Sequence, residues 1–132
     1  MILAICIDDR NGISFNKRRQ SRDGALIKNL AELAGDKKIL IGSYSQPLFT
    51  EGKAAVDDSF IENAADDDIC FAENTDPAAF ADRINGIILY RWNRHYPSDK
   101  KFTLDLSEFE LVSSEEFAGS SHDKITREIY RR

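Results

Sequence analysis

Short runs of consecutive apolar residues recur along the chain, and polar or turn-forming residues separate them. A run of this kind is typical of a strand that is covered on both faces, as in a parallel sheet. Four such strands are predicted, at residues 2–7, 38–41, 69–72 and 87–92. Two more are predicted near the C-terminus, at 109–115 and 124–130. No helical pattern lies between these last two, so we expect them to form an antiparallel pair.

Helical spacing is clearest between the first two predicted strands. Apolar residues recur there at intervals of three and four, at Leu26, Ile27, Leu30, Leu33 and Ala34. This pattern predicts an amphipathic helix, which we expect Ser21 to cap at its N-terminus and Gly35 to end. Residues 14–22 before it are polar, basic and aperiodic, and are predicted to form a loop.

Two shorter helices are predicted, at residues 59–65 and 76–84. Asp76 followed by Pro77 combines an N-cap with a proline at the first helical position. Strands that alternate with helices favour a parallel sheet with right-handed crossovers. The sequence therefore predicts an α/β fold in one domain, residues 1–132. Its central sheet is mostly parallel, flanked by helices and closed by the C-terminal antiparallel pair.

The composition excludes several classes of protein. A chain of 132 residues with 42% hydrophobic and 31% charged residues is typical of a folded soluble domain. No apolar stretch approaches the roughly 18 residues that a membrane span needs, and Met1–Ile7 lacks the basic flank of a signal peptide. Cys6 and Cys70 lie within apolar runs, which predicts buried free thiols in a reducing compartment and a cytoplasmic protein.

Charge is unevenly distributed along the sequence. The net charge of -5 argues against general affinity for nucleic acids or anionic membranes. Basic residues predominate in 10–38, whereas acidic residues predominate in 51–76, where Lys53 is the single base. Such asymmetry can steer a ligand or orient two copies of the chain, or it can reflect two solvated faces. Both interpretations stay open, and the sequence does not set the oligomeric state.

The order of motifs resembles dihydrofolate reductase over most of the chain. In the C-terminal part, the strand 87–90 is followed by Asp99-Lys100-Lys101-Phe102, a turn at 105–107, the strand 109–115 and a final Ile129-Tyr130-Arg131-Arg132. In the N-terminal part, a strand leads to Asp8, Gly12, a loop with Asn16, an acid at Asp23 near the start of a helix, and a strand that ends in Gly42. The resemblance implies a dihydrofolate reductase-like fold, but a fold does not fix a function.

Asp23 matches the acid that assists protonation in the pterin pocket of that family. This role requires a carboxylate whose desolvation brings its pKa toward the working pH. The alternative is an exposed acid that is favoured by the helix dipole. The loop before it matches the family's mobile loop, yet it carries Lys17, Arg18, Arg19 and, nearby, Arg22 in place of an apolar stretch. With Asn16, these residues are candidates for binding an anion, and a solvated loop is the alternative.

The dinucleotide-binding pattern of the family is missing. Glu73-Asn74-Thr75-Asp76-Pro77 stands where the family has a glycine-rich phosphate-binding turn, and its two acids would repel a diphosphate. After Gly42, Ser43 and Ser45 replace a basic residue and provide only weak candidate cofactor contacts. We therefore predict no cofactor, with NADPH disfavoured.

Two aromatic residues complete the predicted ligand site. Tyr44, next to the two serines, is a candidate ligand-binding residue. Tyr90 stands where the family has a small pocket-lining residue, so it either narrows the pocket or fills a gap in the core. Residues 49–56 look shortened, and we expect an extra strand of the family to be absent there.

Other chemistries find little support in the sequence. With two histidines, His95 and His122, the chain lacks the His-x-His-x-Asp-His ligand set of a zinc phosphodiesterase of the ribonuclease Z type, and no metal site is predicted. His122-Asp123 after two serines resembles a catalytic triad only in its letters, because a triad is defined by geometry, and we expect a turn there. Asp66-Asp67-Asp68 lacks the spacing of a calcium loop.

Three functions are compatible with these observations. We favour a dihydrofolate reductase-like protein that has lost family-type NADPH binding and binds an anionic or heterocyclic small molecule, with or without catalysis. The first alternative is a divergent NADPH-dependent pterin or folate reductase. The second is a nucleic-acid or protein interaction module that uses the basic loop 17–22.

Overall fold

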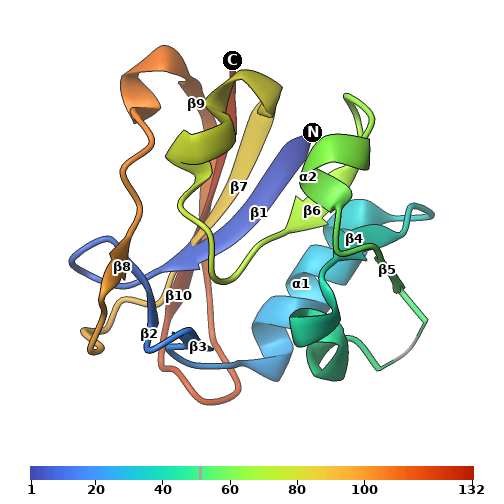
Figure 1. The fold of residues 1–132 in the computed structure, drawn as a ribbon. Helices are drawn as coiled ribbons and strands as arrows, with labels where there is room; N and C mark the ends of the chain where they lie inside the picture. The colour runs from blue at the N-terminus through green and yellow to red at the C-terminus, as the bar shows by residue number, and fades with distance from the viewer. Residues whose placement is uncertain (51) are drawn as a thin grey trace.

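Two β-sheets form the framework of the computed structural model, which describes residues 1–50 and 52–132 (Figure 1). The large sheet contains β1 (Ile2–Ile7), β4 (Ile39–Ile41), β5 (Ala54–Val56), β6 (Ile69–Phe71), β7 (Gly86–Arg91), β9 (Glu110–Phe117) and β10 (Ile125–Arg131). The small sheet contains β2 (Gly12–Phe15), β3 (Arg18–Arg19) and β8 (Lys100–Lys101). Glu51, the first residue of the acidic segment, lies outside the described residues.

The large sheet has the strand order β5-β4-β6-β1-β7-β10-β9. Its first five strands are parallel, and β10 is antiparallel to both β7 and β9. The predicted α/β class, the mostly parallel sheet and the C-terminal antiparallel pair are therefore confirmed. All six predicted strands are present. Five of them contribute buried apolar residues, whereas β9 at the edge of the sheet is mostly exposed and is held by its pairing with β10.

Helices cover the sheet on both faces. They are α1 (Gly24–Ala34), α2 (Phe60–Asn63) and the 3₁₀ helices η1 (Ser43–Leu48), η2 (Pro77–Arg83) and η3 (Leu106–Glu108). Leu3 and Ile5 of β1 face the core beneath α2 and η2, whereas Ala4 faces the core beneath α1. This alternation follows from the two-residue period of a strand. None of the helices in the described part of the chain has the length and apolarity that a membrane crossing requires.

Three local predictions were wrong. The strand expected to be absent from 49–56 exists as β5, because Ala54–Val56 pairs with β4 in parallel register. The predicted loop 14–22 contains the β2–β3 hairpin, whose turn residues Asn16 and Lys17 have φ values of 52° and 62°. The cap of α1 is Asp23 rather than Ser21, because the Asp23 carboxylate accepts hydrogen bonds from the N–H groups of Ala25 and Leu26.

The small sheet lies at the end of the molecule where β1 terminates, away from the two chain termini (Figure 1). Asp8 fixes this junction. Its buried carboxylate accepts hydrogen bonds from the N–H groups of Arg10 (2.9 Å), Gly12 (2.7 Å) and Tyr96 (3.1 Å). Burial alone would raise the pKa of Asp8, but these hydrogen bonds outweigh it and lower the pKa.

Candidate functional site

A narrow cavity lies between α1, the hairpin residues and the ends of β1, β6 and β7. β6 and β7 flank β1 on opposite sides, and in open α/β sheets this is where ligands bind, beyond the carboxyl ends of the strands. Among the residues that line it are Cys6, Arg19, Asp23, Glu73 and Trp92, and we call it the Asp23 cavity. Its volume of about 20 Å³ has room for little more than one water molecule.

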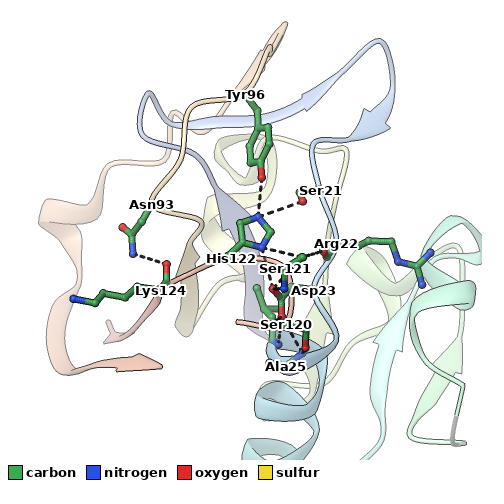
Figure 2. Close-up of polar contacts among 11 residues, drawn as sticks. Ser21, Arg22, Asp23, Ala25, Asn93, Tyr96, Ser120, Ser121, His122 and Lys124 are labelled. Carbon is green, nitrogen blue, oxygen red and sulfur yellow. Dashed lines mark hydrogen bonds and ion pairs between the residues drawn. The ribbon is translucent and has the colours of Figure 1, made fainter. Parts of the chain in front are cut away.

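The Asp23 carboxylate is fully occupied by protein donors. Its Oδ1 atom accepts from the N–H groups of Ala25, Leu26 and Ser120, at 2.9, 3.3 and 2.8 Å. Its Oδ2 atom accepts from the N–H and hydroxyl of Ser121, at 2.9 and 3.2 Å, and from His122 Nδ1 at 2.9 Å. Asp23 therefore joins the first turn of α1 to the β9–β10 loop (Figure 2).

The pKa of Asp23 moves opposite to the direction expected for a proton donor. Burial alone would raise it, but the hydrogen bonds from Ser120, Ser121 and His122 outweigh burial, and the net effect lowers the pKa well below its usual range. The carboxylate is thus held ionised by the N–H groups of Ser120 and Ser121 and by the Nδ1–H group of His122. Arg22, which precedes Asp23 in the sequence, forms no ion pair in the described part of the chain.

His122 is the central residue of a buried cluster that the sequence analysis did not identify. Its Nε2 atom lies 2.7 Å from the Tyr96 hydroxyl and 3.3 Å from the Ser21 hydroxyl (Figure 2). Its ring stacks on Trp92, with the ring centroids 4.6 Å apart. A neutral imidazole that carries its proton on Nδ1 fits the two shortest of these contacts, since Nδ1 donates to Asp23 and Nε2 accepts from Tyr96. The cluster thus ties together the segments before α1, after β7 and between β9 and β10.

Ser21, His122 and Asp23 have the connectivity of a catalytic triad. The shorter contact at Nε2, however, is the one to Tyr96, and a neutral imidazole nitrogen has a single lone pair to offer. In this arrangement the lone pair of Nε2 is directed to Tyr96 rather than to Ser21. The triad suggested by the letters of the sequence involved Asp123, which is exposed, so adjacency in the chain pointed to the wrong acid.

Only part of the predicted basic loop faces the Asp23 cavity. Arg19 and Arg22 line it, whereas Asn16 and Arg18 border a different hollow of about 290 Å³ beside Tyr96. Lys17 is exposed in the hairpin turn. Arg19 forms a two-point ion pair with Glu73, at 2.8 and 3.0 Å, which connects the basic loop to the end of β6.

Tyr90 is a core residue, which corrects its prediction as a ligand contact. It is fully buried, its hydroxyl donates to Asn29 Oδ1 at 2.8 Å, and its ring packs edge-on against Phe117. Burial raises the pKa of this phenol, so it stays protonated. Tyr90 therefore fills the space between α1 and β9, the second of the two interpretations that the sequence left open.

The predicted cofactor contacts are engaged with carboxylates of the chain itself. The Ser43 N–H and hydroxyl donate to Asp58 at 2.7 and 3.0 Å, and the Ser45 hydroxyl donates to Glu73 at 2.7 Å. A Cβ atom at Gly42 would lie 3.3 Å from Asp58 Oδ1, so Gly42 also borders this acid.

At the turn that starts η2, backbone donors are likewise bonded to a carboxylate of the chain itself. The Asp76 carboxylate accepts from Ala78 N–H at 3.2 Å and from the N–H of Thr103 at 3.0 Å. The hydroxyl of Thr103 also donates to Asp76. The backbone donors that could meet an external phosphate there face an internal carboxylate instead.

A larger groove runs along α1 beside η1, and the sequence analysis did not anticipate it. Apolar side chains form its floor, at Ile27, Ala31, Leu48 and Phe49, and its rim includes Arg22, Lys28 and Lys53. We call it the α1–η1 groove. Its volume is about 570 Å³, and Arg22, Ile27 and Leu48 also line the Asp23 cavity, so the two spaces adjoin.

The three cations at this rim differ in whether they have a hydrogen-bond or ion-pair partner within the described residues. Lys53 donates to the Gly35 carbonyl at the end of α1. Arg22 and Lys28 are exposed and form no ion pair within the described residues. A signal for the groove was present in the sequence, since Arg22 precedes the helix and Lys28 and Ala31 lie three residues apart on it. The facing wall, however, comes from residues 47–50 and Lys53. No metal site accompanies it: the described residues contain no group of three His, Cys, Asp or Glu placed to hold a metal ion.

Comparison with solved structures identifies the fold. The chain is similar to the dihydrofolate reductase from Enterococcus faecalis that was solved in complex with NADP(H) and RAB-propyl, with a TM-score of 0.68 and 14% sequence identity. The match covers 100% of this chain and 96% of that one. No protein-family model and no curated protein sequence matches the chain. The chain thus has a dihydrofolate reductase-like fold, as its motifs predicted.

Proposed function

We propose that this protein is a small-molecule binder built on a dihydrofolate reductase-like scaffold, and that its ligand is an organic anion with a flat apolar body. The observation that carries the proposal is the α1–η1 groove. Its volume lies within the usual range of ligand pockets. An apolar floor contacts the body of the ligand, and Arg22 and Lys28 at the rim pair with its carboxylate or phosphate.

The residues at the expected dinucleotide site do not fit NADPH. Three carboxylates, those of Asp58, Glu73 and Asp76, occupy the hydroxyl and N–H donors that a nucleotide phosphate would need. Displacing them would leave the partly buried Glu73 and Asp76 without partners, and all three acids would repel the phosphate. This supports the loss of family-type NADPH binding, and we derive no hydride-transfer step.

The state of Asp23 favours a binder over a reductase. Each of its oxygens accepts from three protein donors, and its pKa is lowered, so it is a poor proton donor at neutral pH. A reductase would require Asp23 to exchange these partners for substrate. The interaction-module alternative would rely on Arg18 and Lys17, because the third cation of the loop, Arg19, is paired with Glu73.

Calorimetric titration with 4-aminobenzoyl-glutamate, an aromatic dicarboxylate, tests the proposal. We expect saturable binding that Arg22→Gln or Lys28→Gln weakens about tenfold, or ~1.4 kcal/mol. The matched control is Lys38→Gln, which removes an exposed cation outside the groove and should leave the affinity unchanged. Equal affinities in all four proteins would contradict the proposal.

The alternatives give different results in parallel assays. A reductase oxidises NADPH in the presence of dihydrofolate and loses this rate in Asp23→Asn. An interaction module binds an oligonucleotide with an affinity that falls steeply with salt, and this binding is lost in the Lys17→Ala, Arg18→Ala double variant. We expect neither activity, and we expect no thermal shift with NADPH.

A further inference from the structure

The guanidinium of Arg19 is surrounded as a bound ligand would be. Its Nε and Nη2 atoms donate to the two oxygens of Glu73 at 2.8 and 3.0 Å, and Nη2 also donates to the Tyr44 carbonyl at 3.1 Å. The Tyr44 ring lies against its face, with Cζ 4.3 Å from the ring centroid. One edge of the planar cation thus meets a carboxylate and one face meets an aromatic ring.

The groups that hold Arg19 belong to a different part of the molecule from Arg19 itself. Glu73 follows β6, and Tyr44 and Ser45 follow β4, so all three come from the carboxyl ends of neighbouring parallel strands in the large sheet. Arg19 comes from β3 in the small sheet, where two residue pairs connect β3 to β2. The groups that hold the guanidinium therefore belong to the large sheet, whereas the Arg19 side chain extends to them from the β2–β3 hairpin.

The Glu73 carboxylate is also held in a fixed orientation by a contact of its own. The Ser45 hydroxyl, which is buried, donates to Glu73 Oε2 at 2.7 Å and fixes the plane of the carboxylate. The Glu73 side chain is 8% exposed. A carboxylate this deeply buried is costly without a cation, and its fixed plane matches two parallel N–H donors better than a single ammonium.

We infer that the cleft formed by Tyr44, Ser45 and Glu73 is a binding site for a planar organic cation, and that Arg19 fills it until such a ligand displaces it. Guanidinium, amidinium and protonated 2-amino heterocycles have the required pair of parallel donors. Because Arg19 and Glu73 also line the Asp23 cavity, removal of the Arg19 side chain opens this cleft toward Cys6 and Phe71, whose apolar surface suits an attached ring. The site uses none of the cations of the α1–η1 groove.

Calorimetry with benzamidine and benzylamine tests this inference. Both probes carry one positive charge and one phenyl ring, but only the amidinium of benzamidine has two parallel donors. Since Arg19 competes for the cleft, we expect Arg19→Ala to bind benzamidine at least about tenfold more tightly than the wild-type protein. In the same variant, benzylamine should bind more weakly than benzamidine, and a second change, Glu73→Gln, should abolish benzamidine binding.

Further variants keep the test decisive. If Arg19→Ala does not fold, Arg19→Lys retains a charge beside Glu73 without the planar fork and should also bind benzamidine more tightly than the wild-type protein. Equal benzamidine affinities in the wild-type protein and the Arg19 variants, absence of binding in all of them, or binding that survives Glu73→Gln would overturn the inference. Arg22→Gln and Lys28→Gln should leave benzamidine binding unchanged, so failure here is distinguishable from failure of the proposed function.

Discussion

At the scale of single residues, Gly119 determines whether the Asp23–His122 cluster can form. A Cβ atom at this position would lie 2.5 Å from Asp23 Oδ2 and 2.8 Å from the His122 carbonyl oxygen, which is closer than atoms in contact can approach. We expect Gly119→Ala to lower the free energy of unfolding by about 2–4 kcal/mol, because it separates the buried Asp23 carboxylate from its hydrogen-bond donors. Urea denaturation measures this value.

The matched control for this prediction is Gly24→Ala. A Cβ atom there would lie 3.6 Å from the nearest atom, Ser120 Oγ, which is an ordinary contact, and Ala is a better helix former than Gly. Gly24→Ala should therefore leave the stability unchanged or raise it slightly. A Gly119→Ala protein as stable as the wild type would show that the β9–β10 loop does not depend on Asp23.

The same scale shows which site residues the sequence could identify. Asp23 was correctly associated with the start of α1, because an acid before a helical pattern is a local signal. His122 could not be assigned to it, since 99 residues separate the two and their contact depends on how the β9–β10 loop folds back. Tyr90 was ambiguous for a similar reason: its partner Asn29 lies on a different element.

At the scale of elements, the β2–β3 hairpin contains local strain that a substitution can relieve. Its turn places Asn16 and Lys17 at positive φ, a conformation that Asn tolerates and Lys does not favour. Lys17→Gly should raise the free energy of unfolding by up to about 1 kcal/mol. Lys17→Ala, which removes the same charge but keeps a Cβ atom, should give no such gain, and thermal unfolding of the two variants compares them. An equal effect of both would mean that charge, not conformation, is decisive.

Elements with a strong apolar pattern could be predicted from the sequence, whereas elements with a weak pattern could not. The strands of the central sheet are nearly continuous apolar runs, so their positions were predicted to within one or two residues. β5 was missed because Ala54 and Ala55 are half-buried and Val56 is exposed, which leaves little pattern to detect. The small sheet was missed because β3 and β8 are basic and only two residues long, and because β2 has a single buried apolar side chain, Ile13. Hydrogen bonds to Asp8, Asp99 and Tyr44 help to hold this region in place.

At the scale of the whole molecule, stability should depend on pH in the acid range. The pKa values of Asp8 and Asp23 are lower in the folded protein than in the unfolded chain, so both groups stabilise the fold above about pH 4, and this contribution is lost as the pH falls through their folded values. The free energy of unfolding should therefore decrease steadily below about pH 4.

Chemical denaturation between about pH 2 and pH 7 measures this dependence. Asp23→Asn should be less stable than the wild-type protein at pH 7, and its stability should change less between pH 4 and pH 2. Asp9→Asn provides the control, because Asp9 is exposed and its carboxylate has no hydrogen-bond partner in the described residues. A slope in Asp23→Asn equal to that of the wild type would contradict the role assigned to this carboxylate.

The whole molecule combines a reductase-like framework with internal contacts at the places where a dinucleotide would bind. Glu73 and Asp76, which the sequence showed as unfavourable for phosphate, are in the structure partners of Arg19 and Thr103, and Asp58 is the partner of Ser43. The adjacent groove keeps exposed cations over an apolar floor. An organic anion is thus expected to bind along α1, and no nucleotide phosphate is expected at the turn before η2.

The most direct test of this account is a pair of titrations followed by amide chemical shifts in a ¹⁵N-labelled sample, one with 4-aminobenzoyl-glutamate and one with NADPH. The account predicts saturable shifts for Ile27, Lys28 and Phe49 with the aromatic dicarboxylate, and unchanged signals for Asn74 and Thr75 with NADPH. Saturable NADPH-dependent shifts at Asn74 and Thr75, together with an undisturbed α1–η1 groove in the first titration, would contradict it.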